Sequence, residues 1–186
     1  MKRCFDLVLV LIASFIFILP ITVIALVLMM TSKGAVIYWS DRVGKNNKNF
    51  RMPKFRTMKL KTPAIASHLL NETKQLITPV GVFLRKTSLD ELPQLWSILM
   101  GYMSFVGPRP ALFNQGDLIR LRTEKGIHKL VPGLTGWAQV NGRDELPIPS
   151  KVGLDWEYVE RQSFGFDLYV LWLTFIKVVR GEGVSH

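Results

Sequence analysis

From residue 7 to residue 30 the chain has no charged side chain and consists mainly of apolar residues. A helix needs about 20 such residues to cross the hydrocarbon core of a bilayer, so this stretch is long enough to enter a membrane. A cleaved signal peptide is not expected, because no region of small residues suited to cleavage follows the stretch. We therefore predict a membrane-embedded segment over residues 1–32 and a second domain over residues 33–186.

Two features of the apolar stretch bear on whether it crosses the bilayer. Pro20 lies near its middle, and a proline removes a helical hydrogen bond and clashes with the preceding turn, so the helix must bend or break there. Lys2 and Arg3 precede the stretch, whereas Lys33 and Arg42 follow it, and such cations favour the cytoplasmic side. We predict a re-entrant helix that returns to the cytoplasmic face, with a kinked spanning helix as the alternative.

Composition narrows the kinds of partner. The 186 residues include 24 Lys and Arg against 14 Asp and Glu, a formal net charge of +10. This excess favours a partner rich in phosphate, which can be a nucleic acid, an anionic lipid or a nucleotide. The single cysteine, Cys4, excludes an internal disulfide framework and fits a reducing cytoplasmic setting.

Two adjacent carboxylates, Asp90 and Glu91, follow the cation Arg85 and precede Pro93. Taken alone, Asp90 has an ordinary explanation as a helix N-cap, with Pro93 inside the first turn. Neighbouring carboxylates repel each other, however, and are expected to recruit a cation or a metal ion. Mg²⁺ commonly bridges a protein carboxylate to a phosphate, and an aspartate can also attack phosphorus directly. The pair therefore predicts phosphate chemistry, with Mg²⁺ held at Asp90 and Glu91.

Arginines near this pair are candidates for binding the phosphates. Arg85 and Arg109 can act as fork-shaped phosphate ligands. Arg109 stands between Pro108 and Pro110, which restrict the backbone that presents it. The chain has no glycine-rich nucleotide motif, so a P-loop or dinucleotide-binding fold is not expected.

The remaining segments predict an α+β fold that is mostly α. Short strands are expected near residues 35–39, 54–61 and 138–143, and helices over residues 92–103, 115–129 and 151–162. The apolar stretch at residues 164–179 is too short to span easily and suits a helix in the membrane interface, with packing into the core as the alternative. We thus expect a small cytoplasmic catalytic domain that carries interfacial helices and short strands.

Four motifs, in this order, resemble the bacterial sugar transferases, which are small monotopic phosphoglycosyl transferases. They are K-F-R-T-M at residues 54–58, L-R-K-T-S-L-D-E-L-P-Q-L at 84–95, V-G-P-R-P at 106–110 and P-G-L-T-G-W-A-Q-V-N-G-R at 132–143. The resemblance covers nearly the whole chain. One departure is Leu19, since the family often has serine before the helix-breaking proline.

The resemblance implies an activity and a location. Members transfer a phospho-sugar from a UDP-sugar to a polyprenol phosphate, usually undecaprenyl phosphate, and release UMP. They do so on the cytoplasmic face of the bacterial inner membrane, as the first membrane step of glycoconjugate assembly. A re-entrant helix anchors them, Mg²⁺ is required, and the first acidic residue of the pair, here Asp90, is the nucleophile that carries the phospho-sugar. Its neighbour Glu91 supports it.

The resemblance and the positions of the cations together predict a set of substrate-binding residues. These are Lys54, Arg56, Arg85, Pro108, Arg109, Gln139, Arg143 and Asp155. The expected partners are the UDP-sugar, undecaprenyl phosphate, membrane phospholipids and, in some members, a second copy of the chain; nucleic acid is not expected. Two alternatives stay open, namely a non-catalytic basic module that binds membranes and a Mg²⁺-dependent hydrolase of lipid phosphates.

Overall fold

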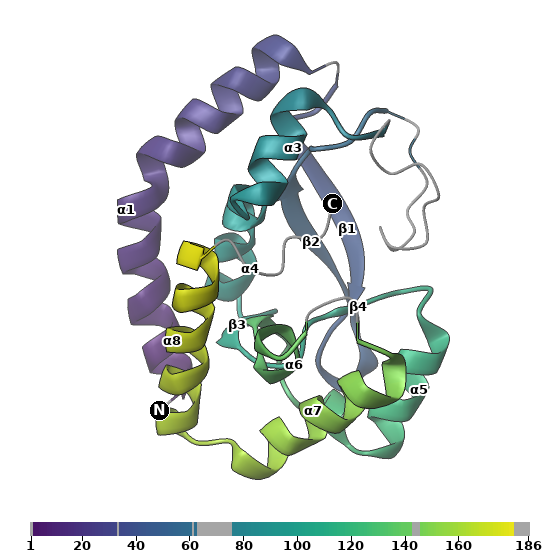
Figure 1. Cartoon of the computed structure of the whole chain (residues 1–186). Coiled ribbons are helices and arrows are strands. Elements are labelled where there is room, and N and C mark those ends of the chain that lie inside the picture. Colours follow the sequence, from purple (N-terminus) through teal and green to yellow (C-terminus); the bar gives the residue numbers. More distant parts are fainter. Residues whose placement is uncertain (1, 33, 61, 63–75, 143–145, 181–186) are drawn as a thin grey trace.

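The computed structural model describes residues 2–32, 34–60, 62, 76–142 and 146–180. It has mixed α and β structure, with helices surrounding short strands (Figure 1). The α-helices are α1 (Lys2–Thr31), α3 (Pro79–Lys86), α4 (Leu95–Leu99), α5 (Gly116–Glu124), α6 (Trp137–Val140), α7 (Ile148–Arg161) and α8 (Phe164–Arg180). The 3₁₀ helices are η1 (Lys45–Asn47), η3 (Leu89–Gln94) and η4 (Ile127–Lys129). The strands are β1 (Ile37–Val43), β2 (Asn49–Phe55), β3 (Ser104–Val106), β4 (Ala111–Leu112) and β5 (Gly133–Thr135).

The larger sheet is a hairpin with a short third strand. β1 and β2 pair antiparallel from Ile37 opposite Phe55 to Val43 opposite Asn49, and β4 pairs with the end of β1. The connection passes through Asn46 and Asn47, whose φ angles are +55° and +57°. Asparagine accepts this left-handed region better than most residues, which suits a tight turn. The hairpin thus carries the end of β2 toward the acidic pair.

The smaller sheet brings two of the sequence motifs together. β3 and β5 pair in parallel, with Val106 opposite Thr135, so the loops that follow both strands leave the same edge. A Cβ atom on Gly133 would lie 2.1 Å from the nitrogen of Gly107. Glycine is therefore required at this approach, which fixes the loop containing Arg109 against the loop before α6.

The first turns of α1 are attached to the domain by charged side chains. The Arg3 guanidinium donates to the carbonyl oxygens of Ile98 and Leu99 at 2.6 and 2.7 Å. The buried Asp6 accepts hydrogen bonds from the hydroxyl of Ser104 and the amide of Phe105. Lys2 forms an ion pair with Asp167 of α8. Since buried charges are costly unless paired, these contacts fix the start of the helix to the domain.

The other end of α1 is attached by apolar packing. Leu28 is fully buried in a cluster with Phe55 of β2 and Leu84 of α3. Between the two attachments the helix presents large apolar side chains outward, such as Phe15, which is 83% exposed. Among the described residues, α1 is the one helix long and apolar enough to cross a membrane, with a mean hydropathy of 3.0.

Pro20 does not interrupt the hydrogen-bonded helix. α1 is continuous from Lys2 to Thr31, although its axis changes direction along its length (Figure 1). The sequence predicted a bend or a break in this segment, and the helix is bent along its length without a break. Both ends of this bent helix contact the same domain, and Figure 1 shows them at opposite ends of that domain.

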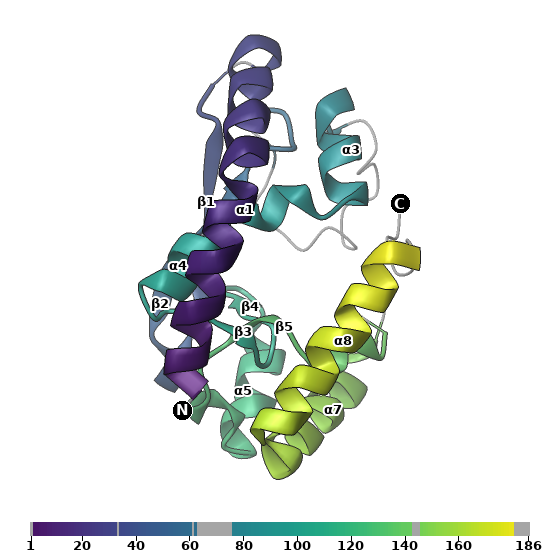
Figure 2. The same cartoon turned by 90° about the vertical axis from the view of Figure 1, so that its left-hand side faces the viewer.

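α8 packs beside the start of α1 and diverges from it (Figure 2). Phe166 and Val170 are buried in the main core, whereas Trp172 and Phe175 are more than half exposed. One face of the helix therefore packs into the core, as the alternative for this stretch predicted, and the other face is apolar and exposed.

Three local predictions were wrong. The strand expected near residues 54–61 is mostly not a strand, because β2 ends at Phe55. The expected strand at residues 138–143 is the short helix α6 in its described part, because this segment follows β5 through Gly136 and turns at once. The expected helix over residues 92–103 is divided into η3 and α4, and β3 begins at Ser104. Pro93, inside η3, accounts for the 3₁₀ geometry, since proline interferes with α-helical hydrogen bonding.

Candidate active site

The acidic pair lies within η3, directly after α3. Ser88 turns the chain with a φ of +57° and a left-handed conformation, so Asp90 stands inside η3 and does not precede it. The interpretation of Asp90 as a helix N-cap is therefore wrong. Asp90 is 9% exposed, and a carboxylate this buried needs electrostatic compensation from its surroundings.

Glu91 is held by two cations from distant parts of the chain. Its Oε1 atom accepts from the Lys54 amine at 2.6 Å and from the Arg109 guanidinium at 2.9 Å. Lys54 comes from β2, and Arg109 comes from the loop between β3 and β4. Although burial works against its charge, Arg109 and Lys54 hold the pKa of Glu91 well below its usual range. The two cations therefore favour the ionised form of Glu91 and offset its charge.

Asp90 has the opposite electrostatic character. Burial raises its pKa above the ordinary aspartate value, and the charge of Glu91 adds to this effect. The positive charges of Lys54, Arg85 and Arg109 act in the other direction. The two adjacent carboxylates thus differ in their electrostatic surroundings. Glu91 forms ion pairs with two cations, whereas Asp90 has a raised pKa and is therefore the more basic of the two.

Arg85 lies on the same side of η3 and is held by the K-F-R-T-M segment. Its Nε atom donates to the hydroxyl of Thr57 at 2.9 Å. Gly81 allows α3 to approach this segment, since a Cβ there would lie 2.2 Å from the Thr57 carbonyl oxygen. Burial lowers the pKa of Arg85, and the charge of Asp90 opposes that effect. An arginine remains protonated nonetheless, so Arg85 adds a third cation to the site.

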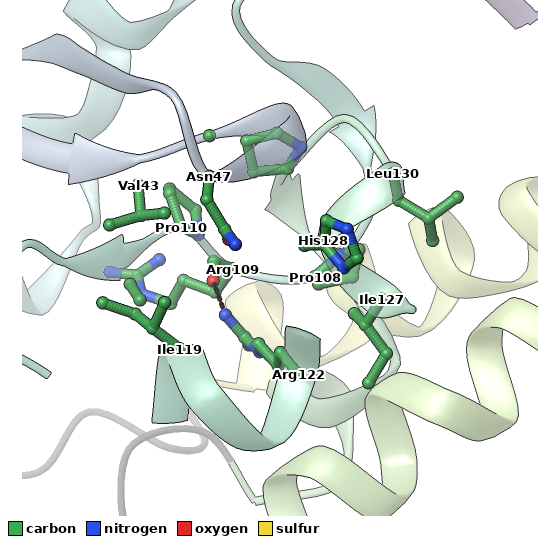
Figure 3. A pocket seen from close by; sticks show the side chains of 13 residues that line it. Val43, Asn47, Pro108, Arg109, Pro110, Ile119, Arg122, Ile127, His128 and Leu130 are labelled. Atoms are coloured by element: carbon green, nitrogen blue, oxygen red, sulfur yellow. Dashed lines mark hydrogen bonds between the residues drawn. The ribbon is translucent and has the colours of Figure 1, made fainter. Parts of the chain in front are cut away.

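A buried ion pair stands behind Arg109. The Arg122 guanidinium binds the Asp155 carboxylate with distances of 2.5 and 2.9 Å and also donates to the carbonyl oxygen of Arg109 at 2.8 Å. Figure 3 shows this last bond, with Arg122 pointing from α5 toward the Pro108–Pro110 turn. The pair thus fixes the backbone of the residue whose side chain reaches Glu91.

The space on this rear side is a small cavity lined by the residues in Figure 3, including Pro108, Arg122 and His128. Its volume is about 30 Å³, which is room for one water molecule and not for a nucleotide sugar. The Arg122 side therefore supports the turn that carries Arg109.

The structure separates the predicted site residues into two groups. Lys54, Arg85 and Arg109 gather around the acidic pair, and Pro108 begins the turn that carries Arg109. Arg56 does not join them, because its Nε donates to the carbonyl oxygen of Ala35.

Three further residues, Gln139, Arg143 and Asp155, were predicted to bind the substrate. Asp155 is 1% exposed and bound to Arg122, which holds the carbonyl oxygen of Arg109. Gln139 is 9% exposed, and its side-chain oxygen lies against Gly136. Arg143 lies outside the described residues. The sequence prediction missed Arg122, because a lone cation in a polar helix gives no signal of a buried partner.

The residues fit a Mg²⁺ ion only if the substrate shares it. Among the described residues, no group of three or more acidic, histidine or cysteine side chains could enclose a metal. Mg²⁺ is usually bound by one or two carboxylates together with substrate phosphates, which matches Asp90 beside the three cations. Glu91 is a poorer ligand, because its Oε1 already accepts from Lys54 and Arg109.

Comparison with known proteins decides the family. The model of the family described as bacterial sugar transferase matches residues 1–181. The chain belongs to the bacterial sugar transferase family. This confirms the resemblance seen in the four motifs.

Relatives in this family differ in length. The chain is 39% identical to the uncharacterized sugar transferase EpsL of Bacillus subtilis, covering 100% of this chain and 91% of that protein. It is 37% identical to the UDP-glucose:undecaprenyl-phosphate glucose-1-phosphate transferase of Escherichia coli, over 95% of this chain but 40% of the relative. It is 36% identical to the UDP-galactose-lipid carrier transferase of Erwinia amylovora, over 98% of this chain and 41% of the relative. The chain therefore spans less than half of these two transferases.

Proposed function

We propose that this protein transfers a phospho-sugar from a UDP-sugar to undecaprenyl phosphate and releases UMP. The observation that carries the proposal is the contrast between the two carboxylates of η3. Glu91 is neutralised by Lys54 and Arg109, whereas burial raises the pKa of Asp90 beside the same cations. Relatives named as glucose-1-phosphate and galactose-lipid carrier transferases support the reaction class. The sugar is left open, since those names differ.

In the first step the ionised Asp90 attacks the phosphorus that carries the sugar. The new bond joins a carboxylate oxygen to phosphorus, and the bond to the bridging oxygen breaks, so that UMP leaves with that oxygen. Arg85 and Arg109 bind the phosphate oxygens as charge moves onto the leaving group. Glu91 is unsuited to the attack, because it would have to give up both of its cations.

In the second step a phosphate oxygen of undecaprenyl phosphate attacks the same phosphorus. The bond to Asp90 breaks, the carboxylate is restored, and the product is a lipid diphosphate that carries the sugar. Covalent catalysis of this kind divides one difficult transfer into two easier ones. The chemistry that Mg²⁺ would supply at Asp90 is neutralisation of the diphosphate charge.

The placement of α1 supports a monotopic, re-entrant anchor, and the cations before and after the apolar stretch favour the cytoplasmic face. A helix that crossed a bilayer would leave its two ends on opposite sides, yet Arg3 and Leu28 both pack against the same domain. The exposed apolar side chains between them would enter the membrane, with α8 beside them in the interface. Such an anchor lets a lipid substrate enter the site from the side.

The activity is tested by measuring UMP release from a panel of UDP-sugars with Mg²⁺, with and without undecaprenyl phosphate. We expect sustained release that requires both the lipid and Mg²⁺, together with a lipid product that carries the sugar. The matched control is Asp117→Asn, an exposed aspartate of α5 that should retain activity. Sustained release without lipid, with free sugar phosphate as product, would replace the proposal with a hydrolase.

The single cysteine gives a direct test of topology. Cys4 is exposed and lies just before the membrane segment, so a membrane-impermeant maleimide reports the side on which that end lies. A Lys48→Cys, Cys4→Ser variant reports the hairpin in the same way. We expect both sites to react only in permeabilised cells. Labelling of Cys4 alone from outside intact spheroplasts would show that α1 spans the membrane.

A further inference from the structure

An apolar groove lies between the membrane helix and the segment that follows the acidic pair. Its walls are Ser14 and Ile21 of α1, Leu92 and Pro93 of η3, and Leu95, Trp96 and Leu99 of α4. The volume of the groove is about 230 Å³. Six of these seven side chains are apolar, and Trp96 is 54% exposed, so the groove is open to the outside on an apolar surface.

The groove is lined by residues that follow the acidic pair on η3. Leu92 and Pro93 line it and directly follow Glu91, which is bound to Lys54 and Arg109. The one short helix η3 thus carries both the acidic pair, with its cations, and two residues of the apolar groove. A molecule with a phosphate at one end and hydrocarbon on the other side fits this arrangement of charge and apolar surface.

The chemistry next to the phosphate distinguishes two kinds of lipid. In a polyprenyl phosphate the hydrocarbon starts at the phosphate oxygen, so apolar carbon would meet Leu92 and Pro93 at once. In a glycerophospholipid a glycerol and its ester carbonyls follow the phosphate, and these polar groups would enter an apolar groove without partners. The groove therefore favours a polyprenyl chain.

The size of the groove limits how much chain it holds. An apolar cavity of about 150 Å³ accommodates benzene, which has six carbons. A groove of about 230 Å³ therefore suits roughly two five-carbon isoprene units, with the rest of a long chain left in the bilayer. The protein would then recognise the start of the chain and not its full length.

The geometry points to this groove as the binding site for the first isoprene units of the lipid-phosphate acceptor, an inference that rests on the proposed function. α1 thus forms one wall of the acceptor site as well as the anchor. The lipid enters between Ser14 of α1 and Trp96 of α4, and its phosphate reaches the cations around Asp90.

Photolabelling tests occupancy without requiring turnover. The probe is farnesyl phosphate with a diazirine on its second isoprene unit, used with the full chain in detergent micelles. We expect labelling within residues 92–99 that unlabelled undecaprenyl phosphate competes away and phosphatidylglycerol does not. Equal competition by phosphatidylglycerol, or labelling confined to other segments, would overturn the assignment.

Variants of both walls test the same inference through kinetics. Ser14→Phe and Leu99→Trp each add an aromatic ring to the groove from opposite sides. We expect each to raise the KM for farnesyl phosphate about tenfold, which corresponds to roughly 1.4 kcal/mol. The exchange of labelled UMP into the UDP-sugar without acceptor should stay within about twofold of wild type, which also shows that the variants fold. The control is Leu19→Phe, which adds a similar ring on the exposed side of α1.

The outcomes separate this inference from the proposed function. An unchanged KM for farnesyl phosphate in both wall variants would show that the groove does not bind the acceptor. The proposed transferase activity would not be affected by that result. Absence of UMP exchange in the wild-type protein overturns the transferase, and the photolabelling still decides whether the groove binds polyprenyl phosphate.

Discussion

The molecule contains two clusters of carboxylate and arginine that share one residue and differ in accessibility. In the front cluster Glu91 binds Lys54 and the side chain of Arg109, and the cations remain partly exposed. In the rear cluster Asp155 binds Arg122, which holds the carbonyl oxygen of Arg109, and both side chains are buried. The same types of group are therefore partly exposed in one place and buried in the other.

This difference shows that the types of residue in an ion pair do not by themselves tell whether the pair can bind a substrate. A partly exposed cation can exchange its carboxylate partner for a phosphate, whereas a buried pair cannot separate without leaving a charge in the core. Changes to the front cluster should therefore reduce chemistry with little loss of stability. Changes to the rear cluster should reduce stability first, and chemistry through the position of Arg109.

The largest expected effect is that of Asp90→Asn. We expect transfer to fall by about 10⁴-fold or more, because the nucleophile is removed while its shape is kept. Because folding raises the pKa of Asp90, its ionised form is less favourable in the folded state, and stability declines as pH rises through that pKa. The asparagine variant should therefore melt at a higher temperature at neutral pH. A turnover assay and a thermal melt check both results, and normal turnover would remove Asp90 from its role.

Glu91→Gln should have the next largest effect. Loss of the charge that holds Lys54 and Arg109 is expected to lower transfer by about 10²-fold to 10³-fold, comparable to loss of one preorganised electrostatic group. The melting temperature should change little by comparison with the rear cluster, since the glutamate side chain is 20% exposed. Steady-state kinetics and a thermal melt of the same preparation measure the two effects.

Asp155→Asn tests the rear cluster. Breaking a buried ion pair from one side costs about 3 to 5 kcal/mol, so we expect a clear fall in the free energy of unfolding. Transfer per folded molecule should fall by roughly tenfold to 10²-fold, since small misplacements of catalytic groups have effects of that size. Denaturant unfolding and the KM for the UDP-sugar are the measurements. The surface control is Glu124→Gln, which belongs to an exposed pair on α5.

The smallest effect concerns pH. Because burial raises the pKa of Asp90, the rate of UMP exchange should fall on acidification at a higher pH than an ordinary aspartate would give. Glu91 contributes to that increase, so Glu91→Gln should move the acidic limb of the profile to lower pH. A limb that stays at the same pH in the variant would contradict the coupling of the two carboxylates.

The sequence predicted the front cluster better than the rear one. Asp90, Glu91 and Arg109 were recognised because they stand in short motifs whose residue types are unusual together. Arg122 gave no such signal, since its partner Asp155 is 33 positions away and only the packing of α5 on α7 brings them together. The predicted roles in catalysis stay predictions, whereas the family is confirmed.

The fold could be predicted from the sequence where one pattern of apolar residues extended over a whole segment. The apolar length of α1 and the composition of α8 were sufficient to predict both helices. Residues 138–143 resembled a strand because apolar and polar side chains alternate there, yet Gly136 lets the chain turn directly from β5 into α6. Local alternation could not reveal that turn, because it depends on close contact with Gly107.

The attachment of α1 at both ends has a consequence for how the protein is made. A chain that began at residue 33 would leave Phe55 and Leu84 without Leu28, and Ser104 without its carboxylate partner. We therefore expect the domain to lose stability when the helix is removed. Purification should accordingly keep the helix, with a lipid or detergent to cover its exposed apolar side chains.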